Sequence, residues 1–446
     1  MAGDLNQTPS ANRVHIGFFG KRNAGKSSLV NAVTGQALSI VSDTKGTTTD
    51  PVQKAMELLP LGPVVIIDTP GIDDEGELGS LRVRRSYQVL NKTDIAVLTV
   101  DVREGLSEPD RALIRRIRDK EIPCILAWTK CDLADEAICS RRVADAAAAG
   151  IAQKDSRAMS GDDTCALPED AAGLLSEEDR ILLTAIPQLF VSAVNGLHIN
   201  ELKECIAAQA AYLENEKRLI SDLLTPEDVV ILVTPIDASA PKGRLILPQV
   251  QVLRDILDAH AGGLVTQTGQ LPAMLASLKQ PPFAVVTDSQ DFGKVMKIVP
   301  DEVPLTSFSI LMARYKGILE CAALGAGALK KIQDGDKILI SEGCTHHRQC
   351  EDIGTVKLPG WIRKFTGKEP QFSFTSGTEF PEDLSSYAMV VHCGGCMLNE
   401  REMRYRMKCA QDQGIPFTNY GTLIAHMNGI LIRSLSLFPD LAEKLK

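Results

Sequence analysis

Short runs of apolar, often β-branched residues alternate with longer helical segments along the first half of the chain. Each run is short enough to be one strand, and each ends in polar residues or glycine. This rhythm predicts stacked βα units around a parallel sheet, where ligands gather at the carboxyl ends of the strands. The expected strands are Val14–Phe19, Val64–Ile67, Ile95–Val100, Cys124–Thr129 and Gln188–Val191.

The same α/β rhythm is repeated twice after Thr225, with a long helical pattern at Ile310–Ile332. At 446 residues the chain has room for about three domains. We predict an α/β protein with domains at 1–224, 225–306 and 307–446, the first with an Ala- and Asp-rich surface insertion at about 136–178. The further strands are expected at Val229–Val233, Gly263–Thr266, Phe283–Thr287, Val303–Phe308, Lys337–Ile340 and Ala388–Val391, and further helices at Leu247–His260 and Leu398–Gln413.

Charge and composition narrow the class of protein. The net charge is −9 and aromatic residues make up 4% of the chain, which argues against a main role in binding nucleic acid. The N-terminus lacks an apolar signal segment and no run of 18 apolar residues occurs, so we expect neither secretion nor a membrane span. The expected compartment is the cytoplasm, where the 11 cysteines are reduced thiols or metal ligands.

A phosphate-binding motif directly follows the first predicted strand. Residues 20–27 read GKRNAGKS and fit GxxxxGK(S/T) between a strand and a helix. Glycines let backbone N–H groups surround phosphate oxygens, Lys26 supplies a cation, and the Ser27 hydroxyl is a magnesium ligand. The candidate contacts in this loop are Asn23, Ala24, Gly25, Lys26, Ser27 and Ser28.

Further polar motifs follow the later strands in a fixed order. Asp68 ends one strand and Gly71 lies shortly after it, where a carboxylate reaches magnesium through water and an amide reaches the γ-phosphate. Thr48 lies in a polar loop and offers a hydroxyl to the same metal. With Thr129-Lys130-Cys131-Asp132 and Ser192-Ala193, these motifs resemble the five sequence boxes of the translation-factor class of GTPases.

This resemblance implies that Asp132 reads the N–H edge of guanine, that Lys130 flanks the base, and that Ser192 and Ala193 support its carbonyl. Two positions depart from the usual pattern. Thr129 replaces an asparagine, so one hydroxyl stands in for an amide that both donates and accepts, which predicts weaker guanine binding. Ile72 follows Gly71 where many small GTPases carry a glutamine that orients water.

Asn23 and the segment from Gly46 to Asp50 resemble the GTPase branch in which bound K⁺ replaces an arginine finger. We therefore expect slow, potassium-stimulated GTP hydrolysis with Lys26, Thr48, Asp68, Gly71 and Asn23 as the catalytic group.

Six of the 11 cysteines lie in the third stretch, and three of them form a spaced motif. Cys344-Thr345-His346 is followed, after 45 intervening residues, by His392-Cys393-Gly394-Gly395-Cys396. Three thiolates with a histidine suit tetrahedral zinc, and three thiolates alone suit a 4Fe-4S cluster with one open iron. A redox pair is the third interpretation. Spacing alone does not separate zinc from iron-sulfur.

The GTPase motifs, the cysteine motif and the segment from Pro235 to Gln249 together resemble the maturation GTPase of FeFe-hydrogenase, the HydF-type family. The resemblance implies that Cys344, Cys393 and Cys396 hold a 4Fe-4S cluster, with His346, His392 or Glu351 as fourth ligand. It also implies a scaffold that receives a two-iron subcluster precursor from radical-SAM maturases and delivers it to apo FeFe-hydrogenase. The middle domain would make a homodimer and the last domain would hold the cluster.

Two other classes remain open from the sequence. A ribosome- or tRNA-related GTPase has similar nucleotide motifs, but residues 307–446 carry nearly equal numbers of basic and acidic residues and lack a GXXG loop. A zinc-stabilised regulatory GTPase would use the cysteines structurally. We expect no nucleic acid and no membrane among the partners.

Overall fold

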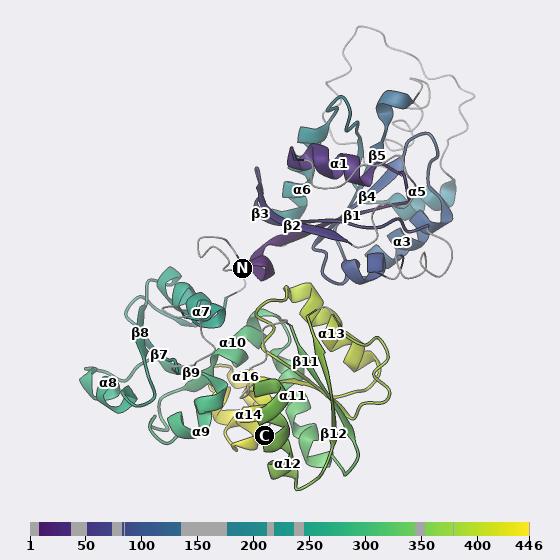
Figure 1. Ribbon diagram of the computed structural model, residues 1–446. Coiled ribbons are helices and arrows are strands. Elements are labelled where there is room, and N and C mark those ends of the chain that lie inside the picture. Colours follow the sequence, from purple (N-terminus) through teal and green to yellow (C-terminus); the bar gives the residue numbers. More distant parts are fainter. Residues whose placement is uncertain are drawn as a thin grey trace. The chain divides into compact units, whose positions relative to one another are not determined.

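A computed structural model of the protein describes residues 9–36, 51–73, 83, 85–134, 176–211, 218–235, 245–343, 353–377 and 379–445. The chain divides into two compact units, residues 1–215 and 216–446 (Figure 1). The predicted insertion at 136–178 lies almost entirely outside the described residues. Within the described part, no helix has both the length and the apolar character that crossing a membrane requires.

The first unit is built on a six-stranded sheet with the order β2-β3-β1-β4-β5-β6. Five strands are parallel, and β2 pairs antiparallel with β3 at the edge. The five predicted strands are all present, which confirms the parallel sheet, whereas β2 was not predicted. The strands are β1 (Val14–Phe19), β2 (Val52–Leu58), β3 (Gly62–Asp68), β4 (Ile95–Asp101), β5 (Cys124–Thr129) and β6 (Gln188–Phe190).

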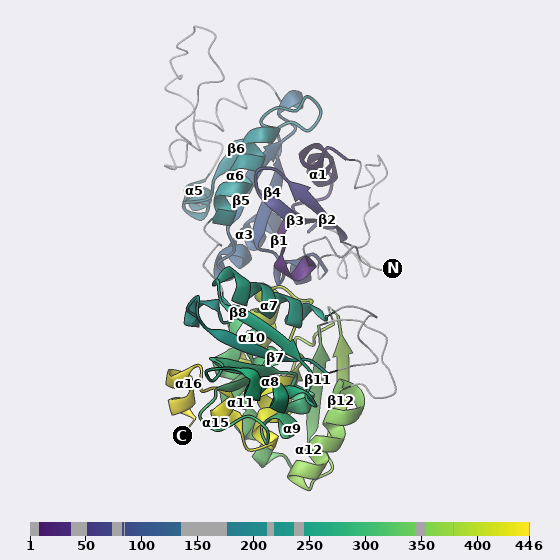
Figure 2. The same ribbon diagram turned by 90° about the vertical axis from the view of Figure 1, so that its left-hand side faces the viewer.

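Helices cover both faces of this sheet, as parallel strands joined by crossovers require. Helices α1 (Lys26–Thr34) and α6 (Ile199–Ala211) pack on one face, and α3 (Glu108–Asp119) and α5 (Glu177–Leu183) pack on the other (Figures 1 and 2). Each face has its own buried apolar cluster. In sheets of this kind ligands bind at the carboxyl ends of the strands.

The second unit contains two four-stranded sheets in which every neighbouring pair is parallel. One has the order β10-β9-β7-β8 and the other the order β12-β11-β13-β14. The strands are β7 (Val229–Val233), β8 (Gly262–Thr266), β9 (Ala284–Thr287), β10 (Leu305–Ser307), β11 (Lys337–Glu342), β12 (Gln371–Ser376), β13 (Met389–His392) and β14 (Phe417–Asn419). The helices are α7 (Leu247–Asp258), α8 (Leu271–Ser277), α9 (Phe292–Val295), α10 (Phe308–Tyr315), α11 (Leu319–Ala326), α12 (Leu358–Thr366), α13 (Glu400–Asp412), α14 (Tyr420–Met427), α15 (Leu431–Ser434) and α16 (Pro439–Lys444).

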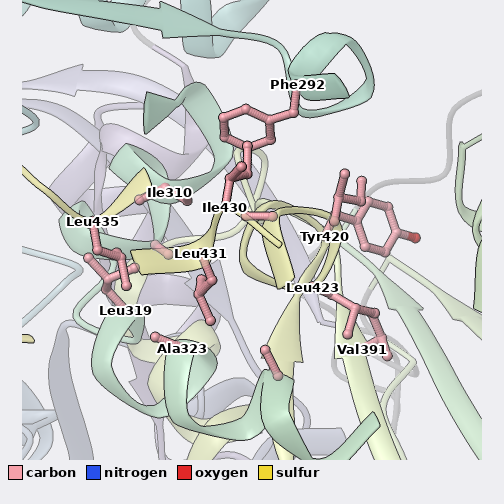
Figure 3. Packing of buried hydrophobic residues seen from close by; sticks show 14 of the residues in the cluster. Phe292, Ile310, Leu319, Ala323, Val391, Tyr420, Leu423, Ile430, Leu431 and Leu435 are labelled. Carbon is pink, nitrogen blue, oxygen red and sulfur yellow. The ribbon is translucent and has the colours of Figure 1, made fainter. Parts of the chain in front are cut away.

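One hydrophobic core runs through both of these sheets. It includes Ile231 and Val285 of the first sheet together with Ile338 and Val390 of the second, all fully buried. Figure 3 shows part of this core, where side chains from α9, α10, α11, α14 and α15 meet. The predicted division between residues 306 and 307 falls inside this unit, within strand β10.

The long helix predicted at Ile310–Ile332 is wrong, because the segment is broken. It forms α10, α11 and a 3-10 turn at Gly327–Lys331. Gly317 lies between the helices with φ 67°, a left-handed conformation that ends α10. Gly325 lets α11 approach β14, since a Cβ there would lie 2.1 Å from the Phe417 carbonyl oxygen. Apolar periodicity continued through both glycines, so the pattern alone concealed the break.

Candidate functional site

The phosphate loop lies between β1 and α1, as its motif predicts. Asn23 and Gly25 adopt left-handed backbone conformations, with φ 62° and φ 89°. The Lys26 ammonium donates hydrogen bonds to the carbonyl oxygens of Gly20 at 2.9 Å and Lys21 at 2.6 Å. The loop thus closes around a buried cation, which is where an anionic phosphate would be bound.

The predicted magnesium ligands meet beside this loop. Ser27 Oγ, at the start of α1, donates a hydrogen bond to Asp68 Oδ2 at 2.7 Å, at the end of β3. Asp68 is buried, and its other oxygen, Oδ1, has no hydrogen-bond partner within the described part of the chain. A carboxylate with one oxygen to spare suits a metal-bound water. The third expected contributor, Thr48, lies outside the described residues.

The segment after β3 is connected to the phosphate loop by backbone contacts. The Ile72 amide donates to the Gly20 carbonyl at 3.3 Å, and the Arg22 amide donates to Asp73 Oδ1 at 2.6 Å. Gly71 fits closely, since a Cβ there would lie 2.9 Å from the Arg22 nitrogen. The Ile72 side chain is buried in the core cluster, so it offers nothing that could orient water. Asp73 was not among the predicted site residues.

Thr129 binds the phosphate loop. Its hydroxyl lies 2.6 Å from the Ala24 carbonyl oxygen and 3.1 Å from that of Val100, and the residue is 4% exposed. A hydroxyl has one proton, and here protein carbonyls take it. Guanine N7 and O6 are acceptors, so Thr129 has no proton left for them. The hydroxyl oxygen can still accept a hydrogen bond, and a role of Thr129 toward the base stays a prediction.

We expect Thr129→Val to weaken GTP binding roughly three- to tenfold, because it removes about 1 kcal/mol of hydrogen bonding that holds the phosphate loop. Thr129→Ser keeps the hydroxyl and should bind like the wild type. Titration of both variants with a fluorescent GTP analogue measures the difference. Equal affinity of the Val and Ser variants would show that the bond to Ala24 is unimportant.

Lys130 forms an ion pair with Asp101, which was not among the predicted site residues. Lys130, with φ 59°, places its ammonium 3.1 Å from Asp101 Oδ2, and Arg103 forms two hydrogen bonds with the same carboxylate. Burial alone would raise the pKa of Asp101, but the hydrogen bonds from Arg103 and Lys130 outweigh it and lower the pKa well below its usual range. Asp101 could have been predicted as a site residue, because it lies at the carboxyl end of β4, where parallel sheets bind ligands.

Asp132 and Ser192, which follow strands β5 and β6, are joined by a hydrogen bond. Ser192, which follows β6 and is fully buried, donates from Oγ to Asp132 Oδ1 at 2.5 Å. The amide of Val194 donates to the same hydroxyl at 3.3 Å. Ala193 lies between these residues in the turn. The exposed Asp132 carboxylate is thereby held at the edge of the sheet and can accept the N–H groups of a guanine ring.

The cysteine loop follows β13 in the second unit. The Cys393 sulfur accepts hydrogen bonds from the amides of Gly343 at 3.1 Å and Gly395 at 3.4 Å. Gly395 has φ 65°, and a Cβ there would lie 2.5 Å from the Met403 sulfur. Cys396 is half-buried against the core that includes α10. Amide donors stabilise a thiolate and a metal bound to it.

Three further predicted ligands, Cys344, His346 and Glu351, lie outside the described residues. Among the residues that are described, no group of three potential ligands gathers around one point. Gly343, the residue before Cys344 in the sequence, nevertheless contacts the Cys393 sulfur, and the strands that lead to the two halves of the motif, β11 and β13, are neighbours.

His392 is fully buried and both its ring nitrogens have partners. Nδ1 lies 2.9 Å from the Cys393 carbonyl oxygen and Nε2 lies 3.1 Å from an Arg406 guanidinium nitrogen. Burial, and then the Arg406 charge, lower the pKa of His392 to about 3, so the ring is neutral. Nδ1 then carries the proton and Nε2 accepts. In this conformation no lone pair of His392 is available to a metal.

Three family models match the chain. They are the 50S ribosome-binding GTPase at residues 15–130, the hydrogen maturase F dimerization domain at 219–317 and the hydrogen maturase F tetramerization domain at 320–437. With the phosphate loop and guanine motifs in place, the chain is a P-loop GTPase followed by two α/β sheets. By the order of its domains the chain belongs to the HydF-type hydrogenase maturases.

Curated relatives resemble the GTPase part. The tRNA modification GTPase MnmE of Chromobacterium violaceum is 34% identical over 143 residues, 32% of this chain and 29% of that protein. GTPase Der of Clostridium botulinum is 34% identical over 128 residues, 28% of this chain and 29% of that protein. The chain thus spans less than a third of the length of these relatives.

Solved structures include Aquifex aeolicus Era bound to GDP.AlF4-, with 14% identity and a TM-score of 0.33 over 81% of this chain and 93% of that one. Bacterial elongation factor EF-Sec has 18% identity and a TM-score of 0.32 over 46% of this chain and 30% of that one. At these TM-scores we base no inference on either structure.

Proposed function

We propose that this protein is a GTP-hydrolysing iron-sulfur scaffold that receives a two-iron subcluster precursor and delivers it to apo FeFe-hydrogenase in the cytoplasm. The observation that carries the proposal is the amide of Gly343 on the Cys393 sulfur, which supports joining the two halves of the cysteine motif at one point. The hydrogen maturase F matches over the same part of the chain support the proposed role in carrying the precursor to hydrogenase.

The residues of the loop fit a thiolate-bound cluster. Glycines wrap the backbone around the Cys393 sulfur, two amides donate to it, and Cys396 lies three residues further along. We propose Cys344 as the third thiolate because it directly follows Gly343. A cubane cluster bound by three thiolates would supply one iron with an open position for a labile ligand or for cargo.

The fourth ligand is, on this proposal, His346 or Glu351 rather than His392. His392 uses Nδ1 for the Cys393 carbonyl and Nε2 for Arg406. Ligation would break one of these bonds and leave a buried polar group unsatisfied, which costs about 1–3 kcal/mol. We therefore assign His392 to supporting the loop.

In the first unit, the proposed reaction is attack of water on the γ-phosphorus of GTP, with cleavage of the bond to the bridging oxygen, giving GDP and phosphate. Lys26 would neutralise the outer phosphates, Ser27 and Thr48 would hold Mg²⁺, and Asp68 would orient a metal-bound water. Gly71 would offer its amide to the γ-phosphate. Because Ile72 is buried and apolar, no side chain there orients the attacking water, and we propose that hydrolysis is slow.

We expect KCl to raise the hydrolysis rate at least about tenfold over NaCl at equal ionic strength, which is about 1.4 kcal/mol of transition-state stabilisation. Asn23 would hold K⁺ beside the phosphates, since it is exposed on the loop with a left-handed backbone. Phosphate release measured in the two salts tests this. Equal rates would contradict it, and Asn23→Ala should lose the difference between the salts.

The partners we propose are two radical-SAM maturases, apo-hydrogenase and further copies of this chain. The dimerization and tetramerization domain matches support self-association as a homodimer or a larger oligomer.

A role on tRNA, as the name of MnmE indicates for that protein, is the second candidate function, and the match to that GTPase supports it. Salt-dependent binding of the chain to tRNA would favour this candidate.

The deciding experiment is oxygen-free purification with iron and sulfide reconstitution. The proposal expects about four irons and four sulfides per chain, and release of the bound iron species to apo-hydrogenase with a gain of hydrogenase activity. A colourless protein that retains one zinc would contradict the scaffold and favour a zinc-stabilised regulatory GTPase.

A further inference from the structure

Arg406 in α13 is a fully buried arginine with four different partners. Its Nε donates to Glu402 Oε1 at 2.9 Å, and one terminal nitrogen donates to the Gly377 carbonyl oxygen at 2.6 Å. The other terminal nitrogen lies 3.3 Å from Ser341 Oγ and 3.1 Å from His392 Nε2. One guanidinium thus binds four groups from separate segments.

Three of these partners lie at the carboxyl ends of adjacent strands. Ser341 is near the end of β11, Gly377 directly follows β12, and His392 ends β13. Ser341 and His392 are register partners across β11 and β13. These two strands lead into the two halves of the cysteine motif, at Cys344 and at Cys393.

We propose that Arg406 is a positioning residue for the metal centre: its buried guanidinium fixes the spacing between the ends of β11 and β13 and the orientation of His392, and with them the backbone of the loop that carries Cys393 and Cys396. This inference rests on the iron-sulfur scaffold proposed above. It adds a residue from outside the cysteine motif to the machinery that holds the cluster.

The contact continues from Arg406 to the loop through His392. The guanidinium donates to Nε2, so Nδ1 carries the ring proton and donates to the Cys393 carbonyl oxygen at 2.9 Å. The ring orientation and the position of the Cys393 backbone are thereby linked. Partners of this kind orient metal ligands without touching the metal.

A contribution to the stability of the fold does not by itself explain why Arg406 is buried here. A buried ion pair such as Arg406 with Glu402 is often no more stable than apolar residues of similar size. Only arginine offers five donors in a rigid plane, and four partners use that plane here. A lysine would keep the charge but would not span the three strand ends.

The test compares Arg406→Lys with two matched variants, using full-length protein reconstituted without oxygen. Arg433→Lys is the control, because Arg433 also bonds several carbonyls, of Met296, Val299 and Pro300, none of them on β11 to β13. Glu402→Gln removes the charge of the ion pair but leaves the contacts to the strand ends. Each protein is assayed for iron and sulfide, for the rate of iron loss to a chelator, for the EPR spectrum of the reduced cluster and for melting temperature.

We expect Arg406→Lys to lose iron roughly 10- to 100-fold faster than the wild type and to show an altered EPR spectrum. Arg433→Lys and Glu402→Gln should lose iron within about twofold of the wild-type rate, even where the melting temperature falls. Wild-type retention by Arg406→Lys would overturn this inference while leaving the scaffold intact. Loss that follows melting temperature in all three variants would also overturn it, and a wild-type protein without iron and sulfide would refute the scaffold and this inference together.

Discussion

Lys26→Ala is expected to lower GTP hydrolysis on the order of 10²–10³-fold, the effect of removing one donor aimed at developing charge. The ammonium is held inside the phosphate loop by the carbonyls of Gly20 and Lys21, so no neighbouring cation can take its place without rearranging the loop. The iron and sulfide content should stay at the wild-type level, because Cys393 and Cys396 lie in a unit with a separate core. Phosphate release and metal analysis on the same preparation measure both properties.

The matched control is Lys54→Ala. Lys54 is an exposed lysine of β2 whose ammonium bonds the side chain of Gln36, away from the phosphate loop. This variant should hydrolyse GTP at the wild-type rate. Two outcomes would contradict the proposal that the first unit hydrolyses GTP and the second binds the metal. One is a Lys26→Ala protein whose hydrolysis rate stays within twofold of the wild type, and the other is a Lys26→Ala protein that loses its iron.

Cys393→Ala should have the opposite outcome, with loss of nearly all bound iron and an unchanged rate of GTP hydrolysis. The Cys393 sulfur accepts hydrogen bonds from the amides of Gly343, which directly follows β11, and of Gly395, in its own loop. Removing it leaves too few thiolates for a cubane cluster. Iron and sulfide analysis with the visible spectrum after reconstitution gives the result.

Cys321→Ala is the control for this substitution. Cys321 packs at the edge of the same core, and burial raises its pKa, so it is a poor thiolate. Its replacement should leave the iron content unchanged. Equal iron in the Cys393 and Cys321 variants would remove Cys393 from the ligand set, and a fall in GTP hydrolysis in either would argue that the two units are coupled.

The nucleotide site was predictable because its signals are local. A phosphate loop needs glycine, lysine and serine within eight positions, and the parallel sheet then brings Asp68 and Asp132 to the same edge. The tertiary contacts of a side chain, in contrast, are not indicated by the residues around it in the sequence. Nothing near Thr129 in the sequence indicates that its hydroxyl binds Ala24, 105 residues away.

The second unit was predicted less completely, for two physical reasons. Strand β12 has no buried residue, so it lacks the apolar run that marks a central strand. Arg406 sits in a helix of mostly polar residues, where a charged side chain is ordinarily expected to be solvent-exposed, yet it is fully buried and contacts two strands and the residue that follows a third. Such contacts exist only once the sheet has formed.

The shared core of residues 216–446 has a consequence for how self-association and metal handling relate. Helix α10 starts directly after β10, the last strand of the sheet in the dimerization match, and Cys396 packs against the core to which α10 contributes Phe308 and Leu311. From the same helix, Ser309 accepts a hydrogen bond from the Gly421 amide beside the second sheet. One helix therefore packs both with the sheet of the dimerization match and beside the loop that carries Cys396, so these two parts of the unit share a packing element.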